Sequence, residues 1–258
     1  MVPGMSFRPV LRLSAALAAA ALMLLPIGAA DAGAKRPVVV ELFTSQGCNS
    51  CPPADTLLAQ LAASRKDVIA MSLPITYWDM LGWKDSLASE GNTHRQKGYS
   101  LIMGHGGVYT PQMIVDGISD VVGSREAQVT SAVAARQADM QNIAVALSAN
   151  HREVHVAVGP SDDRGEYNAT IWLFRILPQA SVAVSGGENS GHTLAYKNVV
   201  RDIKAVGLWK GQPVTLDLPR QEMTGTSRDS IAVVVQQGGY GRIVGAAMID
   251  HPDYYLIR

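Results

Sequence analysis

Hydrophobic residues in the first half of the chain fall into short apolar runs separated by segments with helical spacing. Residues 38–43 and 68–73 are apolar except for one polar residue in each and contain β-branched side chains, which is typical of strands covered on both faces. Between these runs, three leucines repeat with the spacing of one helical face and predict a helix over residues 54–63. A strand, a helix and a strand of these lengths predict a parallel pair joined by a right-handed crossover.

The chain from residue 77 to residue 141 predicts a helical excursion followed by a second group of elements. The order up to residue 141 is therefore β-α-β, a helical excursion, and then β-β-α. In chain order, these later elements are a partly helical segment over residues 86–101, a Pro-led strand over residues 108–115, a turn at Asp116-Gly117, a strand over residues 118–122, and a helix over residues 125–140 that Ser124 is placed to cap.

From Asn142 onward, apolar and polar residues alternate with a period of two. Several short strands with turn signals between them predict a β-sandwich. The expected fold is thus an α/β domain over residues 36–141 followed by an all-β, sandwich-like domain over residues 142–258. The alternating segments are residues 143–147, 154–158, 169–173, 182–184, 214–218 and 231–235, with a hairpin turn at residues 238–241 before a last strand over residues 243–249.

Residues 1–32 have the organisation of a secretory signal peptide. Arg8 and Arg12 precede an apolar run that is too short to span a bilayer, and small residues such as Ala30 and Ala32 follow it. An uncleaved anchor is the alternative. The expected mature protein is exported to the periplasm or secreted, with no membrane contact after signal cleavage.

The charge balance bears on which partners the protein can have. The full chain has 22 basic and 22 acidic residues, and removing residues 1–32 leaves 20 basic against 21 acidic residues. The sequence has no basic stripe and no polybasic tail. This composition argues against nucleic acid or an anionic membrane surface as a partner.

Cys48 and Cys51 are the only cysteines, and they stand between the first predicted strand and the first predicted helix. Pro52 and Pro53 fit the first turn of a helix, where backbone donors have no partner. We expect Cys48 to be the more exposed, nucleophilic thiol and Cys51 the resolving thiol. A disulfide that closes so short a loop contributes only roughly 2 kcal/mol in the chain-entropy model. A redox or metal-binding role is therefore favoured over a purely structural one.

The sequence assigns no metal and no cofactor. Structural zinc needs four ligands, and no second cysteine pair exists. Copper(I) held by the two thiolates remains an alternative. His94 and His105 are the histidines best placed to approach the cysteines as a third ligand or a general base, although histidines in loops are usually solvated.

The strand, the turn, the C-x-x-C pair at a helix start and the Pro-led strand that follows it resemble the thioredoxin-like superfamily. More specifically, the chain is similar to the secreted thioredoxin-like family catalogued as domain of unknown function 1223. The stretches that carry this resemblance are residues 41–48, 51–55, 77–79, 81–83, 109–112 and 198–201. The resemblance implies a cis peptide bond between Thr110 and Pro111, with the proline packed against an active-site disulfide.

Glu41, Trp78 and Tyr109 complete the candidate site. Glu41 resembles the buried acid that relays protons to the inner thiol of thioredoxins, and its alternative is a carboxylate paired with a nearby base. Trp78, Asp79 and Trp83 are expected to wall a substrate groove, and the alternative is simple packing. Thr110 and Tyr109 are further candidates for substrate binding beside Trp78. A loop over residues 186–192 in the second half either contacts a ligand or partner or is a solvated hairpin loop.

Three classes of function are compatible with these residues. The leading one is an exported thiol–disulfide oxidoreductase that acts on protein thiols and disulfides through Cys48 and Cys51. The second is a protein that binds copper(I) or another soft metal. The third is a non-catalytic interaction protein with an inert disulfide.

Overall fold

The structure of this protein is a computed structural model that describes residue 1 and residues 35–138, 141–162, 165–223 and 229–250. The chain divides into two units, Met1–Asp31 and Ala32–Arg258, and all helices and strands named below belong to the second. Apart from Met1, the predicted signal peptide over residues 1–32 lies outside the described residues. Within the described residues, no helix has both the length and the apolar character needed to cross a bilayer.

The first half of the sequence forms the elements that the apolar pattern predicts, and the helix boundaries shift by only a few residues. The elements are β1 (Val38–Thr44), α1 (Pro52–Ser64), β2 (Val68–Pro74), the 3-10 helix η1 (Asp79–Leu81), α2 (Glu90–Ile102), β3 (Gln112–Val115), β4 (Ser119–Val122) and α3 (Glu126–Ala138).

The second half contains two long strands: β7 is much longer than the alternating pattern predicts, and β8 lies where that pattern predicts no strand. β7 has 15 residues and spans two segments that the sequence suggests are separate strands, and β8 has 17 residues. The described elements of this half are β5 (Val145–Ala149), β6 (Glu153–Val158), β7 (Ala169–Ala183), β8 (Thr193–Trp209), β9 (Val214–Pro219), α4 (Arg220–Met223), β10 (Ser230–Gln237) and β11 (Ile243–Ile249).

The described strands form one large mixed sheet and one small antiparallel sheet, so the fold is mixed α/β. The large sheet has eight strands in the order β11-β10-β7-β8-β2-β1-β3-β4, and the small sheet has three in the order β5-β6-β9. β8 joins β2 in parallel through the pair Ser72 and Val199. Strands from both halves of the sequence therefore share the large sheet, and the division into domains at residues 141 and 142 stays a prediction.

Helices cover both faces of the part of the sheet that contains β1. Val40 and Leu42 pack in one core with residues of α1 and α3, while Phe43 packs on the other face with Tyr99 of α2. All seven residues of β1 are buried. This double cover explains why β1 is a continuous apolar run instead of an alternating one.

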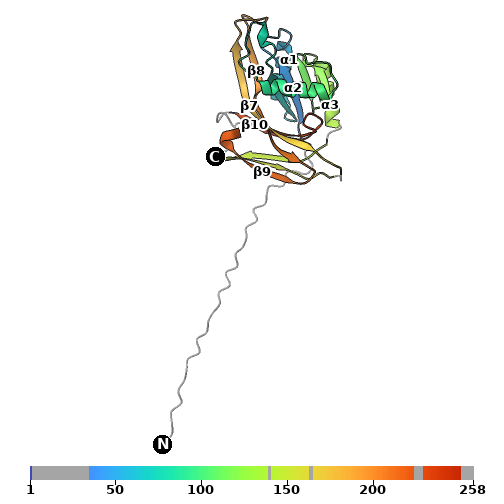
Figure 1. Cartoon of the computed structure of the whole chain (residues 1–258), viewed down its shortest axis with the longest axis vertical. Helices are drawn as coiled ribbons and strands as arrows, with labels where there is room; N and C mark the ends of the chain where they lie inside the picture. The colour runs from blue at the N-terminus through green and yellow to red at the C-terminus, as the bar shows by residue number, and fades with distance from the viewer. Residues whose placement is uncertain (2–34, 139–140, 163–164, 224–228, 251–258) are drawn as a thin grey trace. The chain divides into compact units, whose positions relative to one another are not determined.

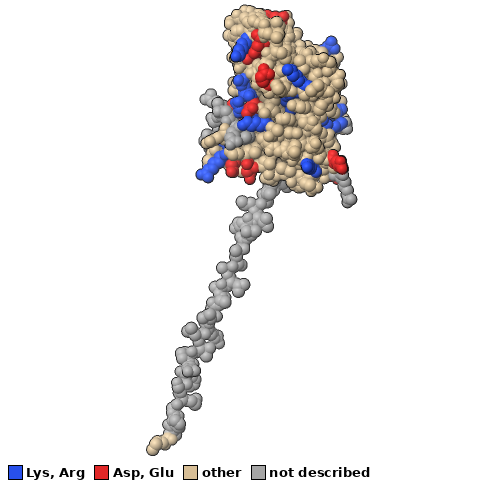
Figure 2. All heavy atoms as spheres, in the orientation of Figure 1, with Lys and Arg blue, Asp and Glu red and all other residues tan. Residues whose placement is uncertain are grey.

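The small sheet packs against the second half of the large sheet. Val154 and Val156 of β6 share a core with Leu173 of β7 and Val233 of β10. Figure 1 shows β7, β8 and β10 in the large sheet and β9 in the separate small layer. Basic and acidic side chains are interspersed over the face of the molecule drawn in Figure 2.

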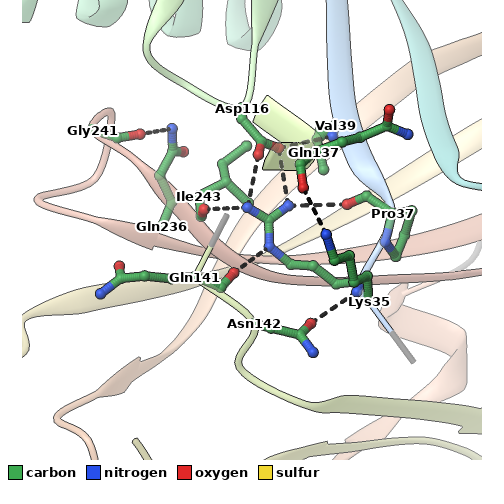
Figure 3. A network of polar contacts seen from close by, with 11 residues as sticks. Lys35, Pro37, Val39, Asp116, Gln137, Gln141, Asn142, Gln236, Gly241 and Ile243 are labelled. Atoms are coloured by element: carbon green, nitrogen blue, oxygen red, sulfur yellow. Dashed lines mark hydrogen bonds and ion pairs between the residues drawn. The ribbon is translucent and has the colours of Figure 1, made fainter. Parts of the chain in front are cut away.

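A buried ion pair ties the start of β1 to the turn between β3 and β4 and to β11 (Figure 3). Arg36 donates to both carboxylate oxygens of Asp116, at 3.0 and 2.7 Å, and to the carbonyl oxygen of Ile243 at 2.7 Å. The backbone N–H of Val39 donates to the same carboxylate at 2.9 Å. Because β11 is the edge strand furthest from β4, these contacts show that the sheet curls and brings β11 toward β1.

Gly117 sits where this curled sheet brings two backbone segments into close approach. Its φ is +75°, and a Cβ atom there would lie 2.1 Å from the backbone oxygen of Gly241. We expect Gly117→Ala to destabilise the fold by about 3 kcal/mol, since the left-handed conformation and the overlap with backbone both oppose a side chain. Chemical unfolding measures this loss. Gly104→Ala is the matched control, because its φ is +71° but nothing lies within 4 Å of the added Cβ. Equal losses in the two variants would contradict the close approach.

Candidate functional site

The two cysteines form a disulfide between the end of β1 and the start of α1. Cys51 is the N-cap residue of α1, and Pro52 and Pro53 occupy its first turn, as the sequence predicts. The Cα atoms of Cys48 and Cys51 are 5.4 Å apart. The Cys51 N–H donates to the carbonyl oxygen of Cys48 at 3.2 Å, which closes the turn. The pair thus lies at the positive end of a helix, where a thiolate is stabilised.

Both cysteines are completely buried, and this corrects the expectation that Cys48 is the more exposed thiol. The exposed fraction is 0% for Cys48 and 0% for Cys51, whereas Asn49 and Ser50 between them are exposed. The sequence expectation rested on the position of Cys48 outside the helix. It could not include the segments from elsewhere in the chain that cover this loop.

One of these segments is the loop between β7 and β8, residues 184–192, which we call the cover loop. The side-chain amide of Asn189 donates to the backbone oxygens of Gln46 and Cys48, both at 2.9 Å. Glu188 accepts a hydrogen bond from the N–H of Asn49 at 3.2 Å. Most residues of the cover loop are exposed, and through Asn189 and Glu188 the loop also contacts the C-x-x-C turn.

Trp83 fills the space between the cover loop and the turn before Cys48. Its indole N–H donates to the side-chain oxygen of Gln46 at 2.8 Å. A Cβ atom on Gly187 would lie 3.1 Å from Trp83 Cβ, so the loop backbone approaches Trp83 closely. Trp83 thus packs beside the turn that precedes the disulfide.

Trp78, Thr110 and Pro111 meet at the same end of the sheet as the disulfide. The peptide bond between Thr110 and Pro111 is cis, as the resemblance implies. Gln112 pairs with Phe43, so Pro111 stands level with the end of β1. The indole N–H of Trp78 donates to the Thr110 hydroxyl at 2.9 Å.

Tyr109 lies next to this group at the molecular surface. Its side chain is 37% exposed, and its hydroxyl donates to Asp120. A Cβ atom on Gly47 would lie 3.4 Å from Trp78 Cβ, which places Trp78 beside the residue that precedes Cys48. The role of Trp78, Thr110 and Tyr109 in substrate binding remains a prediction.

Glu41 forms an ion pair with a base, which is the second of the two roles that the sequence suggests for it. It is fully buried and forms an ion pair with Arg95 of α2. The Tyr99 hydroxyl also donates to Glu41, and Arg95 donates to Gln236 at 2.9 Å. Because side chains alternate along β1, Glu41 points to the α2 face, opposite the face on which Leu42 meets α1.

Asp55, Asp85 and Tyr196, which we call the buried acid cluster, lie beside the C-x-x-C turn, and sequence analysis gave none of them a role. Burial raises the pKa of the Asp55 carboxyl well above its ordinary value, the Thr44 hydroxyl lowers it by donating at 3.2 Å, and the charge of Asp85 raises it further. Asp85 accepts from the N–H of Gln46 at 2.8 Å. The sequence did contain a signal for Asp55, because this acid lies one helical turn after Cys51 on a predicted helix that is otherwise largely apolar.

The other two members of the cluster show the same effect of burial. Burial raises the pKa of Asp85, and backbone N–H donors, first that of Gln46, oppose the rise. Burial also raises the pKa of the Tyr196 phenol, and the charges of Asp55 and Asp85 add to it. Three acids that are costly to ionise are therefore gathered next to the disulfide.

Asp55 gives a testable dependence of stability on pH. The pKa of the Asp55 carboxyl is higher in the folded than in the unfolded chain. Its contribution to the free energy of unfolding is therefore complete below about pH 4, and it is lost as the pH rises through the folded-state pKa. We expect Asp55→Asn to be more stable than the wild type at pH 7, on the order of 1 kcal/mol or more, with the gap closing toward pH 4. Urea unfolding across this range measures it. A gap that does not change with pH would contradict the raised pKa.

The two candidate histidines lie apart from each other in the fold. His105 contacts Asp120, with 2.9 Å between Nε2 and the carboxylate oxygen. His94 lines a cavity of about 330 Å³ together with Arg95, Trp172 and Tyr240. Among the described residues, no group of three or more His, Cys, Asp or Glu side chains is placed to hold a metal ion.

The fold and the site together define a mixed α/β protein with a buried C-x-x-C disulfide at a helix start. The sequence profile of a family described as a protein of unknown function (DUF1223) matches residues 39–236. This match covers more than half of the chain, so the chain belongs to the DUF1223 family, as the sequence motifs indicate.

Two solved structures are similar to this chain. The crystal structure of protein AGR_C_4864 from Agrobacterium tumefaciens is 33% identical with a TM-score of 0.74, and the match covers 85% of this chain and 96% of that one. HBP35 of Porphyromonas gingivalis is 13% identical with a TM-score of 0.59, covering 84% of this chain and 75% of that one, which is a likeness of fold alone. A comparison with curated protein sequences gives no match.

Proposed function

We propose that this protein is an exported thiol–disulfide oxidoreductase and that Cys48 and Cys51 are its redox pair. The proposal includes a thioredoxin-like arrangement over residues 36–141 and a sandwich-like one over residues 142–258. The observation that carries it is the place of the disulfide, at the N-terminus of α1 and next to a buried acid cluster. Helix ends of this kind lower the pKa of a thiol, and groups with shifted pKa values gather at sites of proton transfer.

The proposed reaction is exchange with a protein disulfide. The Cys48 thiolate attacks one sulfur of the substrate disulfide, and the other substrate sulfur leaves as a thiolate. Cys51 then attacks Cys48, which closes the intramolecular disulfide and releases the second substrate thiolate. In the oxidising direction the same steps run in reverse. The signal-like residues 1–32 support export to a compartment in which disulfides persist.

Trapping of the mixed disulfide tests this proposal. In Cys51→Ser, the mixed disulfide on Cys48 cannot be resolved, so we expect covalent adducts that disappear on reduction. Cys48→Ser is the matched control and is expected to trap far fewer adducts, because the resolving thiol does not begin the exchange. Non-reducing electrophoresis of the exported protein, purified after rapid alkylation, measures both. Equal trapping by the two variants, or none, would argue against the proposed roles.

The burial of both cysteines favours a second candidate, a non-catalytic interaction protein with an inert disulfide. A sulfur with an exposed fraction of 0% cannot meet a partner thiol in the arrangement described here. This candidate predicts that Cys48→Ser leaves the cellular phenotype of the protein intact. The oxidoreductase predicts instead that the cover loop opens to admit the substrate.

A further inference from the structure

The strands β2 and β8 separate at the end of β2 that lies away from the disulfide. β1 runs parallel to β2 and pairs with all seven of its residues, whereas β8 pairs with β2 only through Ser72 and Val199. Before this pair, the side-chain amide of Asn198 donates to the backbone oxygen of Ala70 at 2.9 Å. A side chain thus bonds the edge of β2 at a place where a neighbouring strand would otherwise supply a backbone donor.

Asn198 has an unusual backbone conformation at this separation. Its φ is 51°, in the left-handed region that residues other than glycine seldom adopt. Such residues cluster at binding and active sites, where the surrounding structure holds them in place. Asn198 also begins residues 198–201, one of the stretches that carry the family resemblance, and the redox function proposed above gives it no task. Both observations point to a second functional place in the fold.

A cavity of about 650 Å³ lies where the two strands separate. Sites for small molecules have volumes of about 300–1,000 Å³. Asn198 lines this cavity, and residues of α1, β2, β7, β8 and β11 surround it. Its apolar wall includes Val68, Ile69, Pro178 and Met248, and no described residue around it has an aromatic ring. The cavity therefore suits an aliphatic group better than a flat ring.

Two lysines of the cavity lack a counter-ion. Lys66 comes from the segment between α1 and β2, and Lys197 comes from β8. Among the described residues, neither ammonium group has an ion-pair or hydrogen-bond partner. Arg65 is the third base of the lining, but two hydrogen bonds of 2.8 Å bind it to Asp67. Asp250 is the one acid among the described residues of the lining, so the cavity carries an excess of positive charge.

We propose that this cavity binds a small carboxylate with an aliphatic body, of the class of medium-chain fatty acids. The carboxylate lies between the ammonium groups of Lys66 and Lys197, and the hydrocarbon part lies against Val68, Ile69 and Met248. Charge pairing fixes the orientation of the ligand, and burial of its methylene groups supplies most of the affinity. The inference is independent of the redox function, because none of the described lining residues belongs to the C-x-x-C turn.

Other classes of ligand fit the same residues less well. A cation is opposed by three bases against one acid, and a neutral ligand leaves both lysines without a counter-ion. A flat aromatic acid finds no ring on which to stack. An extended peptide that pairs with the edge of β2 would have to displace Asn198 from the backbone oxygen of Ala70.

The test is isothermal titration calorimetry of the purified protein with octanoate. We expect one site per chain with a dissociation constant below about 1 mM. Octanamide has the same hydrocarbon part without the charge, and butanoate has the charge with a shorter hydrocarbon part. Each is expected to bind more weakly by about tenfold or more, since each lacks one of the two contributions. Octanamide that binds as tightly as octanoate would overturn the role of the lysines.

Matched double variants locate the charge that binds the carboxylate. Lys66→Met combined with Lys197→Met keeps the aliphatic stems and removes both ammonium groups, so octanoate should bind more weakly by about tenfold or more. Lys84→Met combined with Lys97→Met changes the net charge equally at two exposed lysines, and we expect an affinity within about twofold of the wild type. Equal affinities in the two double variants would overturn the proposal.

A further variant tests the cavity instead of the charges. Ala63 lines the cavity and is exposed, so Ala63→Trp should fill the space without disturbing the core and should abolish the binding of octanoate. In amide NMR spectra of the wild type, octanoate should shift the signals of Ile69, Ala70 and Asn198. An absence of binding heat at millimolar octanoate, or shifts confined to other parts of the chain, would overturn the proposal.

Discussion

Arg95→Met is expected to destabilise the protein by about 3–5 kcal/mol, which corresponds to a fall in Tm on the order of 10 °C. The substitution leaves the carboxylate of Glu41 in the core without its cation, and Glu41 has an exposed fraction of 0%. A buried charge that loses its partner carries the full cost of its desolvation. Chemical unfolding at neutral pH measures the loss.

Two companion variants separate this effect from a general loss of packing. Arg65→Met breaks the ion pair between Arg65 and Asp67, whose two side chains are 33% and 52% exposed. We expect this variant to lose less than about 1 kcal/mol of stability, because exposed ion pairs contribute little. The double variant Glu41→Leu with Arg95→Met removes both charges and should recover much of the loss. A loss below about 1 kcal/mol for Arg95→Met alone would contradict a buried ion pair at this place.

Asn189→Ala is expected to speed reduction of the Cys48–Cys51 disulfide by on the order of tenfold. The Asn189 amide makes two hydrogen bonds that hold the cover loop on the C-x-x-C turn. Each is worth about 0.5–1.5 kcal/mol, so their loss favours the open loop by a total of about 1–3 kcal/mol. Since a reductant must reach a buried sulfur, its rate follows the population of the open form.

The measurement is the rate of thiol appearance with dithiothreitol, followed by alkylation. Ser190→Ala changes an exposed position of the same loop and is expected to leave this rate unchanged. If the disulfide of the Asn189→Ala variant were reduced at the wild-type rate, opening of the cover loop would not control access to the disulfide. Another segment would then have to move.

Local patterns were enough to predict the elements that hold the site. The apolar runs of β1 and β2 indicate strands buried on both faces, and the proline pair indicates the first turn of α1. β8 was not predicted, because its pattern of polar and apolar residues is irregular. Many of its 17 residues are half-buried, and charged residues such as Lys204 lie within it. Asn198, also within β8, has a φ of 51°. A long strand with mixed exposure carries no clear period.

Contacts between distant segments could not be read from the sequence. Asn189, which donates to the backbone oxygen of Cys48, is 141 residues away from it, and the partner of Glu41 is 54 residues away on another element. Neither contact leaves a local signal. The pairing of β8 with β2, which merges the two halves into one sheet, is likewise a tertiary feature with no counterpart in hydrophobic periodicity.

The reduction potential of the Cys48–Cys51 pair tests the central claim most directly. The wild-type protein would be equilibrated across glutathione ratios and then alkylated to count free thiols. A working oxidoreductase predicts a value between roughly −270 and −120 mV. A value below about −300 mV would mark an inert structural bridge and contradict the proposed function.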